Sequence, residues 1–422
     1  MVLQIDCLSS PEECKYSILL SAYACEPGLG SEAAVGWGWA VNLAQSAHHV
    51  HVLTRSSNRA RIELSNLVHT CRNLQFTYFD LPPWMRFWKR GNRGVHLYYL
   101  LWQVGAYFVA RRLVRKRHFD LVHQVTYVTA RFPSLMGLLG LPFVYGPLAG
   151  GEYAPRALWQ GMEVSGVIKE SLRYVSMSLW RLSPLLNLTF FSARRIFATS
   201  NQTLHQLPKH AQRKAQVMLG IAWDSDDGGG TFRHARSGTF EILYAGHFVY
   251  LKGMEYGLEA VARLLDEHPH IRLTMLGEGP SFTRWLKKSQ SLGLDANVRW
   301  IKSMPRDEFL RRLPFYDALL FPSLHDSGGM VVLEAMAAGL PVVCLDLGGP
   351  GVLVDETCGF KVTAADPAAT VAGLHKALQQ LVADESLGVR LGNAGRRRAH
   401  EVFSWKGRVA RMLRCYKEVL GK

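Results

Sequence analysis

The sequence FYDALLFPSLHDSGGMVVLEAMAAGLPVV, residues 315–343, decides the fold class of this chain. An apolar run over 318–321 predicts a buried strand, and the periodic run over 331–338 predicts a short helix. A second apolar run at 342–344 predicts another strand. This strand–helix–strand order is typical of parallel strands joined by a right-handed crossover, and it favours an α/β fold.

The same alternation continues in both directions along the chain. We expect further strands at 16–22, 50–54, 74–78, 121–124, 143–145, 196–199, 241–245, 272–276 and 298–301. Helical patterns lie between strands, for example at 31–47, 254–267, 281–292 and 367–383. Because 422 residues exceed what one hydrophobic core usually organises, we predict two doubly wound, Rossmann-like domains that face a central cleft.

One segment interrupts the alternation. Residues 224–230 read DSDDGGG, a run of charged and turn-forming residues that indicates a linker. We therefore place the N-terminal domain at 1–222, the linker at 223–236 and the C-terminal domain at 237–403. A last helix at 404–422 is expected to pack back toward the N-terminal domain.

The composition excludes several classes of protein. With 48% hydrophobic and 20% charged residues, the chain is not largely disordered, collagen-like or a coiled coil. Its seven cysteines are scattered and form no C-x-x-C pair, so the sequence predicts neither a disulfide framework nor a metal site. We see no signal peptide, and the apolar stretch 97–110 is too short to span a bilayer. A cytoplasmic protein is expected, either soluble or peripheral on the inner face of the cytoplasmic membrane.

The loops that follow the strands of the second half hold residues suited to a diphosphate. Backbone N–H groups at the helix start, at Met330 and Val331, can bind a diphosphate, and Gly328 and Gly329 allow a close approach. Lys252 supplies a cation for a departing nucleoside diphosphate. Further candidates for the donor side follow two earlier strands, and they are Gly246, His247, Gly277 and Gly279.

Two carboxylates accompany these loops. Asp326 precedes the predicted helix and Glu334 lies inside it, so the two could accept hydrogen bonds from sugar or ribose hydroxyls. Taken alone, each is more typical of an exposed acidic residue. The glycines and the order of the neighbouring motifs favour the binding role.

At these residues the chain resembles glycosyltransferase family 4 (glycosyl transferases group 1), whose members have the two-domain GT-B fold. The family pattern has a lysine–glycine block, then a Glu, seven residues, Glu block that leads into LEAMA-x-G-x-PV. The matching residues here are Lys252, Gly253, Glu334, Ala335, Met336, Ala337, Gly339, Pro341 and Val342. The resemblance implies transfer of a sugar from a nucleotide-sugar to a hydroxyl with retention of configuration, without a cofactor or an obligatory metal.

The resemblance also implies roles for single residues. The catalytic set it suggests is Lys252, Asp326, Glu334 and His123. Asp326 stands where the family has a Glu, and His247 stands where the family has a phosphate-binding Arg. We hypothesise that His247 still contacts the diphosphate, because its position after the strand is kept.

The N-terminal half supplies candidates for the other wall of the cleft. In the family, a glycine-rich loop near Gly30, Ser31 and Glu32 faces the cleft, which makes these residues acceptor-side candidates. Ser31 fits a helix N-cap equally well. His123, at the end of a strand, either reaches the donor sugar or is a core histidine. Glu152, in a second glycine-rich loop, is another acceptor-site candidate.

Between Leu81 and Phe119 there are nine basic residues, no acidic one and eight interleaved aromatic residues. The chain as a whole has a formal net charge of +15, which points to phosphates as partners. Basic and aromatic residues together suit the headgroup region of an anionic membrane. The same mixture could bind single-stranded nucleic acid, or it could be a core helix with a solvated basic end. We favour the membrane and expect no nucleic-acid partner.

The leading functional hypothesis is a glycosyltransferase with a nucleotide-sugar donor. Its expected acceptor is a saccharide or a lipid-linked molecule in bacterial envelope, capsule or exopolysaccharide synthesis. One alternative is a metal-dependent transferase that uses Asp224 and Asp226. Others are a nucleotide-sugar epimerase or hydrolase on the same fold, and a basic protein that only binds lipid or nucleic acid.

Overall fold

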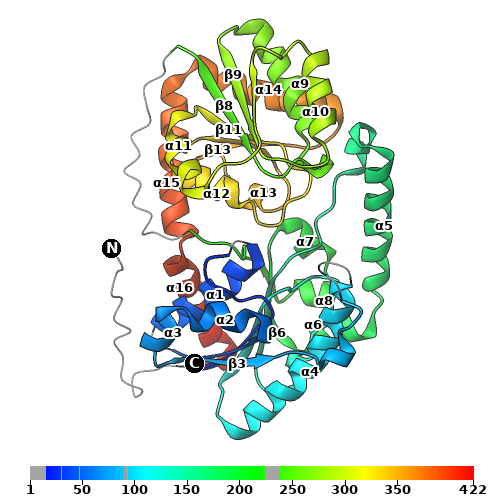
Figure 1. Cartoon of the computed structure of the whole chain (residues 1–422), viewed down its shortest axis with the longest axis vertical. Helices are drawn as coiled ribbons and strands as arrows, with labels where there is room; N and C mark the ends of the chain where they lie inside the picture. Colours follow the sequence, from blue (N-terminus) through cyan, green and yellow to red (C-terminus); the bar gives the residue numbers. More distant parts are fainter. Residues whose placement is uncertain (1–15, 30, 47, 90, 92–93, 224–237) are drawn as a thin grey trace.

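The computed structural model describes residues 16–29, 31–46, 48–89, 91, 94–223 and 238–422. The predicted linker therefore lies outside the described residues, apart from Trp223. The described chain forms two α/β domains, and the first half of the sequence makes the lower one in Figure 1.

The N-terminal domain is built on a seven-stranded sheet of order β3-β2-β1-β4-β5-β6-β7. Every strand pair in it is parallel. The strands are β1 (Ser17–Ala22), β2 (His49–Arg55), β3 (Leu74–Phe79), β4 (Leu121–Thr126), β5 (Phe143–Leu148), β6 (Ala193–Ala198) and β7 (Ala215–Val217). β4 and β5 are buried along their whole length, because helices cover both faces of a parallel sheet.

The C-terminal domain is built on a six-stranded parallel sheet of order β10-β9-β8-β11-β12-β13. The strands are β8 (Phe240–Ala245), β9 (Ile271–Leu276), β10 (Val298–Ile301), β11 (Ala318–Phe321), β12 (Val342–Leu345) and β13 (Gly359–Val362). In each sheet the strand order reverses once, between β1 and β4 and between β8 and β11. Ligands of such sheets bind at these reversals, beyond the carboxyl ends of the strands.

The prediction of two doubly wound domains is confirmed. All eleven predicted strands are present, with shifts of a few residues at their ends. The sequence missed β7 and β13, each of which forms one edge of its sheet. Both are short and only partly buried, so they lack the continuous apolar run that marks an inner strand.

Helices cover both sheets and connect the strands. The longer ones are α1 (Ser31–Gln45), α4 (Val95–Lys116), α5 (Val164–Trp180), α6 (Pro184–Ser192), α9 (Met254–Glu267), α10 (Phe282–Ser291), α12 (Met330–Ala337), α14 (Pro367–Ala383), α15 (Glu385–Val402) and α16 (Trp405–Leu420). The shorter ones are α2 (Arg59–Glu63), α3 (Asn66–Thr70), α7 (Asn201–Gln206), α8 (Lys209–Gln212), α11 (Arg306–Arg312) and α13 (Pro350–Leu353). Within the described residues, no helix is long and apolar enough to cross a membrane.

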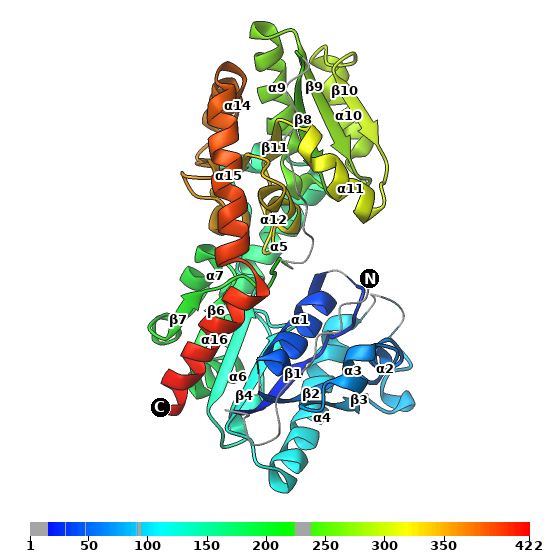
Figure 2. The same cartoon turned by 90° about the vertical axis from the view of Figure 1, so that its left-hand side faces the viewer.

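The last two helices carry the chain from one domain to the other. Figure 2 shows α15 along the C-terminal domain and α16 below it along the N-terminal domain. Trp405, the first residue of α16, packs edge-on against Trp39 of α1, with ring centroids 5.5 Å apart. The hydroxyl of Tyr416 lies 2.6 Å from Nδ1 of His123 on β4. The final helix thus contacts the N-terminal domain over most of its length.

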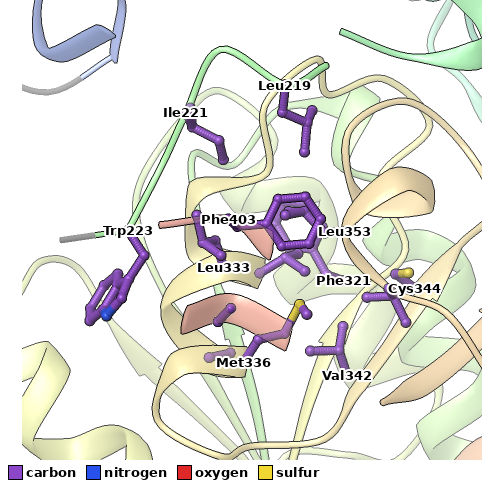
Figure 3. Packing of buried hydrophobic residues seen from close by; sticks show 14 of the residues in the cluster. Leu219, Ile221, Trp223, Phe321, Leu333, Met336, Val342, Cys344, Leu353 and Phe403 are labelled. Atoms are coloured by element: carbon purple, nitrogen blue, oxygen red, sulfur yellow. The ribbon is translucent and has the colours of Figure 1, made fainter. Parts of the chain in front are cut away.

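A second connection passes through residues 219–223. The N–H of Trp223 donates to the carbonyl of Phe403 (2.8 Å), and the N–H of Trp405 donates to the carbonyl of Trp223 (3.3 Å). Figure 3 shows Leu219 and Ile221 on this segment above a shared apolar cluster that includes Phe403 and residues of α12. The two domains therefore share part of one hydrophobic core.

Helix α5 makes a third connection on the opposite side of the molecule, at the right-hand edge of Figure 1. The Tyr250 hydroxyl lies 3.3 Å from Oε1 of Glu170 on α5. Arg173 of α5 donates to Nδ1 of His325 at 2.5 Å. In the C-terminal domain, Tyr250 lies two residues before Lys252, and His325 directly precedes Asp326. The helix therefore links the N-terminal domain to those loops.

Candidate functional site

A pocket of about 360 Å³ lies between the two domains, within the size range of typical ligand sites. The N-terminal domain and the segment that leaves it supply Glu32, Val35, Val125, Pro147, Ala149, Thr199, Gly220 and Ile221. The C-terminal domain supplies Ala245, Gly246, His247, Lys252, Phe321, Asp326, Ser327, Gly328, Gly329, Met330 and Val331. Eight of the predicted donor-side residues thus line one pocket, next to the reversals of strand order.

Lys252 and Asp326 form an ion pair on the C-terminal wall of this pocket. The Lys252 Nζ lies 2.5 Å from Oδ2 of Asp326 and 4.9 Å from the centre of the Phe321 ring. Gly253, which follows the lysine, has a φ of +62°, and a Cβ there would lie 2.2 Å from the carbonyl oxygen of Pro322. The close approach of these two chain segments therefore requires glycine, and it brings Lys252 beside Asp326.

Asp326 also holds the loop that leads into α12. Its Oδ1 accepts hydrogen bonds from the N–H groups of Gly328 (3.0 Å) and Gly329 (2.8 Å). Burial alone would raise the pKa of this carboxyl, but the Lys252 ammonium and the two N–H groups outweigh burial and lower the pKa. Asp326 is therefore a charged group held in place from two sides.

The start of α12 faces the pocket with Met330 and Val331. Gly329, the N-cap residue, has a left-handed conformation (φ +72°) and no side chain that could cap the helix. The first N–H groups of a helix have no intrahelical partner, and the helix dipole makes this end attractive to anions. This end of the pocket is suited to a phosphate group.

His247 lies in the exposed part of the same wall, after β8. Gly277 and Gly279 line a neighbouring pocket of about 380 Å³ together with the rings of Phe248, Phe282 and Trp300. A Cβ on Gly277 would lie 2.0 Å from the carbonyl oxygen of Gly246, so this glycine allows the loops after β8 and β9 to touch. The aromatic pocket is thus a direct neighbour of the loop that carries His247.

Glu334 is buried on the second turn of α12 and does not line the described pocket. Its Oε1 lies 3.1 Å from Nη2 of Arg306, at the start of α11. The sequence offered no signal for this partner, since Arg306 belongs to no motif. In this structure the Glu334 carboxylate is therefore paired with an arginine rather than directed into open space.

Glu32 lies on the opposite wall, on the first turn of α1. Its Oε2 accepts a hydrogen bond from the N–H of Tyr127 (2.9 Å). Burial raises the pKa of this carboxyl, and the Tyr127 N–H offsets the rise only in part. A carboxyl group of raised pKa thus faces the ion pair of the other domain. Gly30 lies outside the described residues, and Ser31 begins α1.

The structure places His123 in the core rather than in the pocket. It is fully buried, its Nε2–H donates to the carbonyl of Gly146 (2.8 Å), and its Nδ1 accepts from Tyr416. Burial lowers the pKa of the imidazole to about 4. Both ring nitrogens have partners within the protein. The surroundings of His123 therefore fit a core histidine and do not fit a residue that reaches the donor sugar.

Glu152 is likewise fully buried and surrounded by donors. Its Oε1 accepts from the hydroxyls of Thr199, Ser200 and Thr203 at 2.8–2.9 Å, and its Oε2 accepts from the N–H of Gly150. All four donors belong to the N-terminal domain, and together they engage both oxygens of the carboxylate. Glu152 therefore organises the loop after β5 and is not presented to an acceptor.

Sequence reasoning missed the residues that approach the ion pair from α5. His325 stands directly before Asp326, and Arg173 of α5 donates to it. Burial, and second the charge of Arg173, lower the pKa of His325 to about 4. The sequence signal for this group was the adjacent pair His325 and Asp326. Nothing in the sequence pattern of α5 indicates the direction of the Arg173 side chain.

Comparison with known proteins agrees with this geometry. Residues 232–398 match the family model described as "Glycosyl transferases group 1". This segment is a group 1 glycosyltransferase domain. It contains Gly246, His247, Lys252, Asp326 and the helix start at α12, which together make the C-terminal wall of the pocket.

Curated relatives of the group 1 glycosyltransferase domain include the glycogen synthase of Mycobacterium tuberculosis (strain ATCC 25618 / H37Rv). It is 31% identical over 175 residues, which are 41% of this chain and 41% of that protein. The D-inositol 3-phosphate glycosyltransferase of Streptomyces avermitilis is 31% identical over 235 residues, which are 51% of this chain and 49% of that protein. The chain thus spans about half or less of the length of these relatives.

Solved structures match the group 1 domain and the N-terminal domain together. The sucrose-phosphate synthase of Thermosynechococcus elongatus has a TM-score of 0.63 and 19% identity, and the match covers 96% of this chain and all of that one. The Anabaena protein HepE, solved in complex with UDP and glucose, has a TM-score of 0.57 and 14% identity over 95% of this chain and 99% of that one. These matches show that the described part of the chain has the GT-B fold.

The aromatic residues of segment 81–119 are not all at the surface of the protein. Tyr98, Tyr99 and Trp102 of α4 are buried in the core of the N-terminal domain. Trp84 and Phe87 are exposed at 72% and 77%. Three of the eight aromatic residues that suggested a membrane surface therefore belong to the core, and three are exposed, since Phe108 is also 54% exposed.

Proposed function

We propose that this protein is a glycosyltransferase that moves a sugar from a nucleotide-sugar to a hydroxyl acceptor, with retention of configuration. The observation that carries the proposal is the pocket between the domains, in which Lys252 and the start of α12 lie opposite Glu32. The group 1 domain supports the transferase class, and the UDP and glucose bound to HepE support a nucleotide-sugar donor.

The diphosphate of the donor belongs beside Lys252 and the N–H groups at the start of α12. When the bond between the anomeric carbon and the diphosphate oxygen breaks, negative charge collects on the departing diphosphate. A fixed ammonium group and aligned N–H groups stabilise that charge without having to reorganise. Lys252 pairs with Asp326 in the structure, so a bound diphosphate would share or replace that partner.

The base of the nucleotide is proposed to enter the aromatic pocket beside Gly277 and Gly279. Phe282 and Trp300 line this pocket, and flat rings of this kind stack on a nucleobase. His247 lies between the two pockets, after β8, and is proposed to contact the diphosphate.

The acceptor is proposed to enter from the N-terminal wall, where the Glu32 carboxyl can accept a hydrogen bond from its hydroxyl group. In a retaining transfer, the departing phosphate oxygen can take the acceptor proton while the new bond forms on the same face of the sugar. We propose a saccharide or lipid-linked acceptor of bacterial envelope, capsule or exopolysaccharide synthesis. Contact of residues 81–119 with the cytoplasmic face of an anionic membrane would rest on the exposed Trp84 and Phe87 and on the basic end of α4.

A panel of nucleotide-sugars tests the proposal through release of nucleoside diphosphate. The matched variants are Lys252→Ala and Lys376→Ala, because Lys376 is an exposed lysine of α14 outside the pocket. We expect Lys252→Ala to lower the rate of release by about 10²–10³ and Lys376→Ala to retain it. Free sugar or an epimerised nucleotide-sugar as the sole product would instead identify a hydrolase or an epimerase.

A further inference from the structure

Helix α5 turns its apolar side toward solvent. Along the helix, large apolar residues recur every three or four positions, which places them on one face. They are 54–77% exposed, and they are Val164, Ile168, Leu172, Val175 and Leu179. In Figure 1 this helix forms the right-hand edge of the molecule. An ordinary surface helix buries such a stripe.

The opposite face of α5 is buried and largely polar. Gly166, Glu170 and Met177 are buried there, and Arg173 is partly buried. Glu170 pairs with Arg173 (3.5 Å), and these two residues contact Tyr250 and His325 of the C-terminal domain. Polar contacts therefore hold this helix in place, and the described part of the chain leaves its apolar face uncovered.

Further large apolar residues are exposed in the chain that follows α5. Four further large apolar residues are 41–78% exposed across the turn and along α6, and they are Leu182, Leu185, Leu188 and Phe191. We call these nine residues of α5, the turn and α6 the apolar face. Soluble monomers rarely expose so many large apolar side chains in one run, and such surfaces mark sites of interaction.

The charge close to the apolar face is mostly positive, although Glu163, the exposed N-cap residue of α5, is acidic. Residues 164–222 contain eight lysine and arginine residues and a single acidic residue, Glu170, which is buried. Lys169 and Arg181 are exposed beside the stripe, and Arg156 lies over the Tyr174 ring, 4.1 Å from its centre. A long apolar stripe among basic residues is complementary to the headgroups and acyl chains of an anionic lipid surface.

A second copy of the chain fits this face less well. A symmetric dimer would bring the same patch of both copies together, and the basic residues around the patch would then repel one another. A lipid surface supplies both the apolar phase and the opposite charge.

We propose that the apolar face of α5 and α6 is the surface by which this protein lies on an anionic bilayer. Phe132 connects the end of α5 to α4, since its ring centroid lies 5.9 Å from that of Trp180 on α5 and 5.3 Å from that of His96 on α4. The inference rests on the proposed function only for the nature of the acceptor, because binding to vesicles needs no turnover.

Flotation of the full chain with phosphatidylcholine vesicles, with and without 30% phosphatidylglycerol, tests this proposal. The variant is Leu172→Glu/Leu179→Glu, and the matched control is Leu64→Glu, an 83% exposed leucine near α2. Phe87→Glu serves as a third variant to separate the apolar face from the segment 81–119. Circular dichroism and thermal unfolding verify that each variant is folded.

We expect the wild-type chain and Leu64→Glu to float with the anionic vesicles and to be released by high salt. The double variant should bind at least about tenfold more weakly, because two leucines no longer enter the lipid and two new charges repel it. Failure of the wild-type chain to float would overturn the proposal. Three other results would also overturn it: binding of the double variant equal to that of the wild type, loss of binding by Phe87→Glu while the double variant still binds, or a concentration-dependent dimer that the double variant abolishes. Diphosphate release with a water-soluble acceptor, measured in parallel, shows whether the proposed transferase activity stands independently.

Discussion

Lys252 and His247 occupy the same wall of the pocket but differ in their partners. Lys252 is held 2.5 Å from Asp326, whereas His247 lies in the exposed part of the wall. A fixed ammonium group is always available to a departing diphosphate, while an imidazole carries a full charge only when it is protonated. We therefore expect Lys252→Ala to lower kcat by about 10²–10³ and His247→Ala to lower it less.

Steady-state kinetics of diphosphate release, together with donor titration by calorimetry, measure both effects. Unchanged donor affinity in His247→Ala, next to lost affinity in Lys252→Ala, would contradict the hypothesis that His247 contacts the diphosphate.

His123 gives the stability of the protein a dependence on pH. Burial lowers the pKa of this imidazole to about 4, against an ordinary value of about 6.5. The stabilisation is complete above pH 6.5. As the pH falls from 6.5 to 4, the imidazole of His123 binds a proton in the unfolded chain but stays neutral in the folded chain. The free energy of unfolding therefore decreases by about 3 kcal/mol. Below pH 4 this contribution no longer changes.

Urea unfolding of the wild-type chain and of His123→Gln at pH 7, 5.5 and 4.5 measures this dependence. The variant loses the two hydrogen bonds of His123 at every pH, but the gap to the wild type should narrow as the pH falls. His118→Gln is the control, because that side chain is 84% exposed. A gap that stays constant from pH 7 to 4.5 would show that His123 does not titrate in this way.

At the scale of single residues, the sequence located the pocket better than it assigned each role. Gly246, Lys252 and Asp326 follow strands, and the carboxyl ends of parallel strands must meet at one edge of a sheet. His123 and Glu152 also follow or end strands, yet both are buried among donors and acceptors of their own domain. Which way such a side chain turns depends on tertiary neighbours, such as Tyr416, that stand hundreds of residues away in the sequence.

Among the elements, α1 and α16 meet with almost no free space. A Cβ on Gly38 of α1 would lie 1.9 Å from the Trp405 ring, so the ring occupies the place of a side chain. Gly38→Ala should therefore destabilise the protein by about 1–3 kcal/mol, although alanine favours a helix. Thermal unfolding measures the loss.

A second substitution controls for the cause of this loss. In the Trp405→Leu background the large ring is absent, and Gly38→Ala should then cost much less than in the wild type. Equal costs in the two backgrounds would show that contact with Trp405 does not explain the requirement for glycine.

The elements also show which patterns a sequence can and cannot supply. Inner strands such as β11 and β12 are continuous apolar runs, and they were predicted. Edge strands β7 and β13 carry no such run and were missed. The periodicity of α5 reveals an amphipathic helix, but the side that faces inward is polar, and only the contacts with the C-terminal domain show this.

For the whole molecule, the net charge of +15 has a specific distribution. Residues 164–222 alone contribute eight basic residues against one acidic residue. The lining of the pocket has no such excess, since it holds one lysine, Lys252, and two acidic residues, Asp326 and Glu32. The excess charge is therefore a property of the N-terminal surface rather than of the pocket.

The shared pocket predicts how a ligand changes the unfolding of both domains. Residues of both domains line it, and Phe403, Trp223 and Trp405 join the domains in one core. A nucleoside diphosphate that binds only the folded chain adds about 2.7 kcal/mol at a concentration of 100 times Kd. We expect UDP or another nucleoside diphosphate to raise the temperature of a single calorimetric transition by a few degrees, and Lys252→Ala to reduce the rise. Two transitions, of which only one shifts with the ligand, would contradict this prediction. They would show that the domains unfold separately and that one domain alone binds the ligand.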